Sequence, residues 1–338
     1  MIKNREIRVS LVLIPEATAS TLLSVFDIFR LFSHIVPGEK PYCVTIVADT
    51  TQPIMTASGI ELKANATFDA APVADIVIMP SLVPPTSEWP TGQHPRMMDW
   101  LRAQYAQGAV LGSACTGVFP MLEAGVYDGI PVTCHWDYER ALRHSFPGAD
   151  LRIDKTLIIA GPDNRLVMSG ATGSWHDLVL HLISRFSGPA AATAIAKFFL
   201  LQWHPEGQAA YVRFTEDLTH NDAAIVKAQA WVRQHWTRAN PVDEMMRTSG
   251  LPERSFKRRF RNATGLSPMD YVQHTRIEHA KQLLENSALP VDTIAADVGY
   301  GDAAFFRKLF KRVTTLTPSA YRMKFRTTYG ATSANPAP

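Results

Sequence analysis

The C-terminal part of the chain repeats one pattern, first as DEMMRTSGL at 243–251, SFKRRF at 255–260 and GLSPMDY at 265–271, then as DTIAADVGY at 292–300, FRKLF at 306–310 and TLTPSAY at 315–321. The two copies are about 50 residues apart, and the second has one extra residue after its turn glycine. A repeat of this length indicates two copies of one supersecondary unit.

Each copy predicts a helix-turn-helix unit. Gly250 and Gly299 mark the turns, and phenylalanines four residues apart give the second helix of each copy one apolar face. The opposite face of each helix is rich in Lys and Arg, and such a helix suits the major groove of DNA. We expect these two helices to begin near Glu253 and Asp302.

Position along the two helices assigns roles to the exposed residues. The base-edge candidates are Arg254, Lys257 and Arg258 in the first copy, and Ala303, Ala304, Arg307 and Lys308 in the second. The alanines suit a thymine methyl group. Ser255 is a further DNA-contact candidate, and the phosphate candidates are Arg261, Lys311 and Arg312.

The repeat and the sequence between its copies resemble a known family. With RIEHAKQLL at 276–284 and Val-Gly-Tyr at 298–300, residues 222–326 look like the DNA-binding domain of AraC/XylS transcription regulators. The resemblance implies double-stranded promoter DNA as a partner, with RNA polymerase as a further one. Thr315 departs from the family, which has a glycine where Gly265 stands in the first copy. We expect a strained turn at Thr315.

Charge is divided between the two halves of the chain. Residues 221–338 contain 18 Lys plus Arg against 10 Asp plus Glu, whereas residues 1–220 contain 16 against 21. The basic half is the half with the repeat, as DNA binding requires. With 338 residues, 46% of them hydrophobic, the chain can bury two cores, so two domains are expected.

Composition also bears on compartment and cofactors. The three cysteines are odd in number and have no metal-ligand spacing, so we expect neither a metal nor another cofactor. There is no apolar run of about 18 residues or more, and the first residues lead directly into a strand-like segment at 7–14. We expect a cytoplasmic protein without a targeting signal or a membrane partner.

Residues 1–190 alternate between strand and helix patterns. Continuous apolar runs at 9–14, 42–48, 75–79 and 109–112 predict strands, with helices between them at 22–32 and 95–107. This pattern favours an α/β, flavodoxin-like parallel sheet covered on both faces, next to an all-α C-terminal domain with two helix-turn-helix units. An antiparallel pair at 157–160 and 166–169 and helices at 174–186 and 190–203 are expected to follow.

The sequence GSACTGVFPMLEAG at 112–125 is typical of a nucleophile elbow. Small residues surround Cys115 because the central residue of an elbow lies in a strained turn before a helix. The dipole of that helix would lower the pKa of the thiol. His135, 20 residues later, is the candidate imidazole.

Residues 7–188 resemble the PfpI/ThiJ-like branch of the class I glutamine amidotransferase superfamily, with Cys115 and His135 at the positions of the elbow cysteine and its histidine. Thr21 stands where the family has an acid, and Ser81-Leu82 replaces the glycine pair that helps to bind an oxyanion. Joined to AraC-like repeats, this domain resembles the GlxA-like subfamily. In that subfamily the domain senses a small metabolite, such as an amino acid, amine or betaine, rather than turning it over.

The predicted effector site therefore contains Thr21, Ser81, Cys115, Thr116, His135 and Trp136. Trp136 and Trp175 either form an aromatic wall for a cationic effector or pack in the core. Two further motifs resemble catalytic ones but are interpreted as structural. The WHPE sequence at 203–206 predicts a helix end, and Asp177 is expected to cap or pair locally beside His176.

Two other functions remain open at this point. The chain could be a cysteine-dependent hydrolase or amidase with an accessory basic domain, or its repeat could serve only protein contacts. For the regulator we expect a homodimer with an effector-sensing domain at 1–205, a linker at 206–221, a DNA-binding domain at 222–326 and a disordered tail at 327–338.

Overall fold

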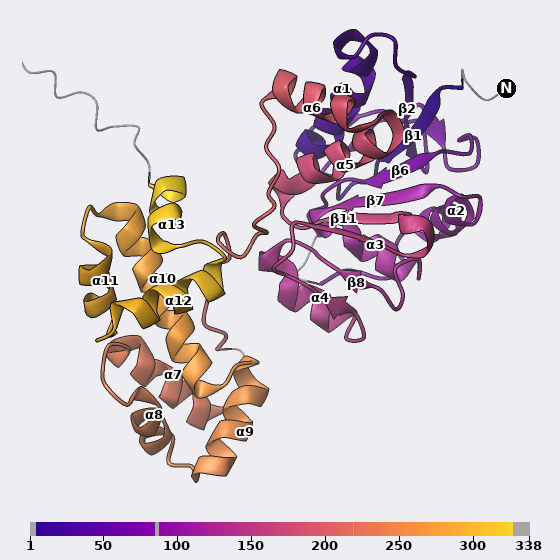
Figure 1. Ribbon diagram of the computed structural model, residues 1–338. Coiled ribbons are helices and arrows are strands. Elements are labelled where there is room, and N and C mark those ends of the chain that lie inside the picture. Colours follow the sequence, from indigo (N-terminus) through magenta and orange to yellow (C-terminus); the bar gives the residue numbers. More distant parts are fainter. Residues whose placement is uncertain (1–4, 85–87, 219, 327–338) are drawn as a thin grey trace, which may run out of the picture. The chain divides into compact units, whose positions relative to one another are not determined.

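The computed structural model describes residues 5–84, 88–218 and 220–326, so the expected tail lies outside the described residues. The chain divides into two compact units, Met1–Gln208 and Ala209–Pro338 (Figure 1). The division lies within the segment that we expected to be a linker. In the described part of the chain, no helix is long and apolar enough to cross a membrane.

The first unit is built on a mixed sheet of seven strands. In spatial order they are β10 (Leu157–Ala160), β11 (Leu166–Ser169), β7 (Val110–Ala114), β6 (Ile76–Met79), β1 (Ile7–Val12), β2 (Tyr42–Ala48) and β5 (Ala66–Thr67). All neighbours pair in parallel except β10 and β11, which are antiparallel. The expected parallel sheet and its antiparallel edge are both confirmed.

Helices cover both faces of this sheet because its strands are apolar on both sides. One face packs against α1 (Ala19–Ile35), α5 (Trp175–Ser187) and α6 (Pro189–Phe199), and the other packs mainly against α2 (Pro95–Ala106), α3 (Val118–Glu123) and α4 (Glu139–Ser145). Helix α6 ends four residues earlier than predicted, because Leu200 adopts a left-handed φ of 55°. Short strand pairs lie outside the sheet: β3 (Ile54–Met55) with β4 (Glu61–Leu62), and β8 (Pro131–Val132) with β9 (Asp150–Leu151).

The second unit is helical. Its described helices are α7 (Ala223–His235), α8 (Pro241–Ser249), α9 (Glu253–Thr264), α10 (Pro268–Asn286), α11 (Val291–Asp297), α12 (Ala303–Thr314) and α13 (Pro318–Phe325). Two apolar clusters support it, one under α7 to α9 and one under α11 to α13, and the long α10 contributes to both. Helices α8 and α9 form the first predicted helix-turn-helix, and α11 and α12 form the second.

The two copies have the same internal geometry. The ring centroids of Phe256 and Phe260 are 5.5 Å apart, and those of the matching pair in α12 are 5.7 Å apart. In each copy a tyrosine then meets the second phenylalanine edge to face, at 5.2 Å in the first copy and 5.4 Å in the second. Thr315 ends α12 at a φ of 65°, where Gly265 ends α9 at 75°, so the expected left-handed turn at a β-branched residue is confirmed.

Candidate functional site

Cys115 lies at the carboxyl end of β7, directly before α3. Its φ is 57° and only 2% of the residue is exposed, which is the strained, buried geometry of an elbow. Gly117 makes this turn possible, because a Cβ atom there would lie 2.5 Å from the carbonyl oxygen of Pro80 and 2.8 Å from that of Met79. The elbow is therefore pressed against the end of β6.

The Cys115 thiol is held as a neutral group. Burial raises its pKa, although a contact of 3.3 Å between its Sγ and Oγ1 of Thr172 acts in the opposite direction. The expectation of a lowered pKa is wrong, because the loss of hydration on burial has the largest influence on this thiol. An ionised nucleophile is disfavoured here at neutral pH.

The loops after β1 and β6 meet the elbow at the same edge of the sheet. Thr116 Oγ1 accepts the N–H of Leu82 at 2.7 Å and donates to the Leu82 carbonyl, so Thr116 ties the loop after β6 to the elbow. The Thr18 hydroxyl donates to the Ser81 carbonyl at 3.1 Å, and its oxygen lies 3.1 Å from Oγ1 of Thr21, within hydrogen-bond distance. Three predicted site residues, Thr21, Ser81 and Thr116, are thereby connected.

Ser81 has the least satisfied side chain of this group. Its Oγ is buried and lies close enough to Cys115 to favour the thiolate weakly, yet among the described residues it makes no hydrogen bond of normal geometry. A buried hydroxyl without a partner costs about 1–3 kcal/mol, which a ligand that hydrogen-bonds to it could recover.

His135 and Trp136 form a separate pair at the start of a short 3-10 helix. The Asp137 N–H donates to His135 Nδ1 at 3.1 Å, and the two aromatic rings are 5.1 Å apart. Burial lowers the pKa of His135. Within the described part of the chain, no hydrogen bond joins His135 to Cys115. Trp175, in contrast, packs against the core of the sheet, as the core alternative predicted.

Two carboxylate–histidine pairs were missed by sequence reasoning. Glu16 Oε1 is 3.3 Å from His94 Nε2, and this bond raises the pKa of His94. Asp177 accepts the backbone N–H of His204 and contacts its Nδ1, both at 2.8 Å. The expectation of local pairing for Asp177 is therefore wrong. Neither pair has a local sequence signal, because 78 and 27 residues separate the partners.

In the second unit, α9 and α12 turn their cationic faces outward, while the repeated phenylalanines on their opposite faces are buried: Phe256, Phe260, Phe306 and Phe310. The predicted DNA contacts Ser255 and Ala303 are half-buried, and the others are exposed: Arg254, Lys257, Arg258, Arg261, Ala304, Arg307, Lys308 and Lys311. Arg307 also bonds to Asp292 on α11. Phe305, absent from the prediction, is 47% exposed at the start of α12 and adds an apolar group to the exposed surface of that helix.

Comparison with known proteins matches both units. Residues 8–184 match the DJ-1/PfpI family, and residues 245–324 match a helix-turn-helix domain. The chain belongs to the DJ-1/PfpI family. The predicted union of a PfpI-like domain with an AraC-type DNA-binding domain is thereby confirmed.

Relatives of this DJ-1/PfpI chain share both of its units. It is 25% identical to the HTH-type transcriptional regulator GbdR of Pseudomonas aeruginosa over 90% of this chain and 83% of that protein. It is 26% identical to the HTH-type transcriptional regulator GlxA of Rhizobium meliloti over 66% of this chain and 68% of that protein. A crystal structure of a candidate transcriptional regulator from Vibrio parahaemolyticus covers 57% of this chain and 99% of its own, at 17% identity and a TM-score of 0.50, which supports the fold.

Proposed function

We propose that this protein is a sequence-specific transcription regulator controlled by a small metabolite. The observation that carries the proposal is the pair of helix-turn-helix units with outward cationic helices. In addition, two relatives that align with this chain over most of their length are named transcriptional regulators. The hydrolase alternative is not favoured, because those relatives are regulators and the Cys115 thiol is buried with a raised pKa.

The DNA-binding part of the proposal assigns α9 and α12 to successive major grooves. Helix α9 would read bases through Arg254, Lys257 and Arg258, and α12 through Ala303, Ala304, Arg307 and Lys308. The exposed cations Arg261, Lys311 and Arg312 would hold phosphate. Successive grooves require a fixed relation between the two helices, which α10 provides as a shared support.

The effector part assigns the metabolite to the carboxyl edge of the parallel sheet, near Cys115. Ligands of open α/β sheets bind at this edge, and here Ser81 Oγ is a buried group without a normal partner in the described residues. Thr21, Thr116, His135 and Trp136 would complete the site. We propose a nitrogen metabolite, an amino acid, amine or betaine, as effector, and no turnover of it. The protein would act as a homodimer and engage RNA polymerase at its promoters.

The proposal is tested with the full-length protein. Duplexes are selected from a random library by repeated binding, and the affinity for the selected sequence is compared with that for scrambled DNA over a range of salt concentrations. We expect a two-part motif and salt-sensitive binding. Binding that shows neither preference nor salt dependence would remove the DNA-binding role and return the repeat to protein contacts.

The effector assignment needs a second measurement. Nitrogen metabolites are screened by thermal shift against the wild type and against Thr21→Ala, Cys115→Ser and His135→Ala variants. We expect stabilisation by one compound class and weaker stabilisation in at least one variant. Ester or amide turnover that disappears in Cys115→Ser would instead establish the hydrolase.

A further inference from the structure

Residues 210–217, which we call the strap, follow the sensor domain and precede the first helix of the DNA-binding unit. Their mixed polar composition suggests a flexible connection. In the structure the strap contains neither helix nor strand, yet it is bonded to α7, α10 and α13 of its own unit. These contacts run from the core of one helix-turn-helix to the core of the other.

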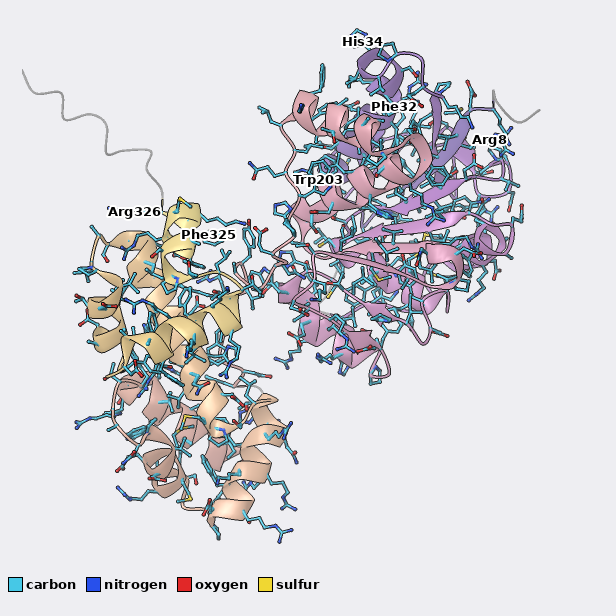
Figure 2. All side chains as sticks on the ribbon, in the orientation of Figure 1. Arg8, Phe32, His34, Trp203, Phe325 and Arg326 are labelled. Carbon is cyan, nitrogen blue, oxygen red and sulfur yellow. The ribbon has the colours of Figure 1, made fainter. Side chains whose placement is uncertain are left out.

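The start of the strap contacts α13 and the apolar cluster that supports the second helix-turn-helix. Ala210 is 1% exposed within the apolar cluster under α11 to α13. The Tyr211 ring meets the Phe325 ring of α13 edge to face, with centroids 5.0 Å apart, and the ammonium of Lys324 lies 5.0 Å from the same tyrosine ring. Phe325 is labelled in Figure 2, near the C-terminal end of α13.

The middle of the strap is held by two charged side chains of α10. Lys281 Nζ donates to the Val212 carbonyl at 2.6 Å, and the Phe214 N–H donates to Glu278 Oε2 at 3.2 Å. Lys281 and Glu278 also contact each other at 3.5 Å, with side chains only 6% and 17% exposed. Their burial depends on a covering segment, because a lysine without a partner is rarely buried to this extent.

The end of the strap contacts α7, α10 and the apolar cluster that supports the first helix-turn-helix. The Phe214 ring packs edge to face on Tyr271 at 5.1 Å, within the cluster under α7 to α9. Arg233 of α7 donates to Glu216 Oε2 at 2.6 Å. Gln229, also in α7, donates to the Asp217 carbonyl at 3.0 Å. Eight residues therefore connect both cores of the DNA-binding unit.

We propose that the strap is a positioning element that holds the two reading helices at one fixed separation and orientation. This inference rests on the proposed DNA-binding function. The two helix-turn-helix units are otherwise joined through α10 and through Arg276, which donates to the carbonyls of Trp236, Arg238 and Gly299. The strap adds a second connection, because it joins α7 and α13 to α10 along a separate stretch of chain. We expect it to hold α9 and α12 in one relative position, so that both helices reach their grooves together.

The consequence is a geometric requirement on the DNA. A rigid pair of reading helices selects two half-motifs at one spacing, because each helix must meet its groove at the same time. Loosening the pair leaves each half-motif readable and relaxes the spacing between them. It also weakens binding to the optimal duplex, because the second helix then docks at a lower effective concentration.

The test uses the full-length protein and a random duplex library. Lys281→Met removes the ammonium of α10 that bonds to the Val212 carbonyl. Phe214→Ala removes the ring of the strap that packs on Tyr271. Lys227→Met, which removes an exposed lysine of α7, is the matched control for charge. For each protein the selected half-motifs, their spacing and the affinity for the wild-type motif are measured, and amide exchange at residues 210–217 reports whether the strap is bound.

We expect the strap variants to select the same half-motifs with a broadened spacing and about 10-fold weaker binding to the wild-type motif, while the control behaves as wild type. Faster exchange in the strap with an unchanged single spacing would overturn the inference and leave the regulator intact. Failure of the wild type to select any motif would instead remove the proposed function. If Lys281→Met does not fold, Phe214→Ala and Glu278→Gln carry the test.

Discussion

The elbow around Cys115 and the reading helices α9 and α12 place their chemistry in opposite settings. Cys115 is 2% exposed and its turn packs against the end of β6, whereas the cations of α9 and α12 are exposed on helices whose opposite faces are buried. On α9 and α12, the spacing of residues along the helix therefore determines which side chains are exposed. At the elbow, the surrounding loops determine whether the Cys115 thiol can react.

This difference concerns tolerance to change. A side chain on the exposed face of a helix can be replaced without moving its support, so two copies of one scaffold can read different bases. The elbow has no such margin, because its backbone meets the end of β6 at contact distance. Four experiments test this difference between the elbow and the helix surfaces.

The largest expected effect is on Gly117. The φ of this residue suits alanine, but the added Cβ would lie 2.5 Å from the Pro80 carbonyl oxygen, so Gly117→Ala should destabilise the protein by about 3 kcal/mol. Lys308→Ala on α12 should change stability by less than about 0.5 kcal/mol. Urea unfolding of both variants gives the two values. Equal stabilities would show that the elbow is as tolerant as the helix surface.

A smaller effect separates the two kinds of cation. Arg258→Ala should weaken binding to the selected duplex by about 1–3 kcal/mol and relax one base position, because a base contact is lost. Lys311→Ala should weaken all sequences alike and reduce the slope of affinity against salt by about 1, because a phosphate contact is lost. Titrations on selected and scrambled duplexes distinguish the two. Identical behaviour of the two variants would contradict the assigned roles.

Exchanging the residues that end α9 and α12 should change the free energy of unfolding by about 1 kcal/mol, in opposite directions for the two helices. Thr315→Gly relieves a left-handed turn at a β-branched residue and should stabilise the unit, whereas Gly265→Thr introduces that strain and should destabilise it. Thermal unfolding of both variants measures the change. If Thr315→Gly does not stabilise the unit, the hydrogen bond from Thr315 Oγ1 to the Thr314 carbonyl offsets the strain.

The last prediction concerns rate rather than stability. Cys115 should react with iodoacetamide more slowly than the exposed Cys43 at pH 8, because burial shields its thiol and raises its pKa. A raised folded pKa also means that the stabilising contribution of the thiol is present below about pH 8.5 and is lost as the pH rises through the folded value. Mass spectrometry of each adduct against pH measures the rates. Faster labelling of Cys115 than of Cys43 would support a reactive thiol and the hydrolase alternative.

Much of the fold could be predicted because its signals are local. The phenylalanines of α9 and α12 repeat at helical spacing, and their observed ring distances differ by only a few tenths of an ångström. The order of the strands has no local signal, whereas the continuous apolar runs were enough to predict that the sheet is parallel. Helix α6 was predicted too long, because nothing in the apolar run 190–203 signals the left-handed turn at Leu200.

The candidate sites divide in the same way. The cationic residues of the reading helices are exposed as their helical positions predict. Around the elbow, the glycine at 117 could be foreseen, but the contact of Cys115 with Thr172 could not. That contact joins residues 57 positions apart, on the loops after β7 and β11. The bond between Asp177 and His204 joins residues 27 positions apart and likewise has no local signal.

The residues alone were enough to predict the two helix-turn-helix copies, with their buried phenylalanines and outward cations, and the parallel sheet with its elbow, because each depends on spacing within about ten residues. The protonation of the thiol, the partner of Asp177 and the course of the strap over α10 emerge only once the chain is folded. Those outcomes depend on burial and on groups from distant parts of the chain, and desolvation and long-range hydrogen bonds leave no periodic trace in a sequence.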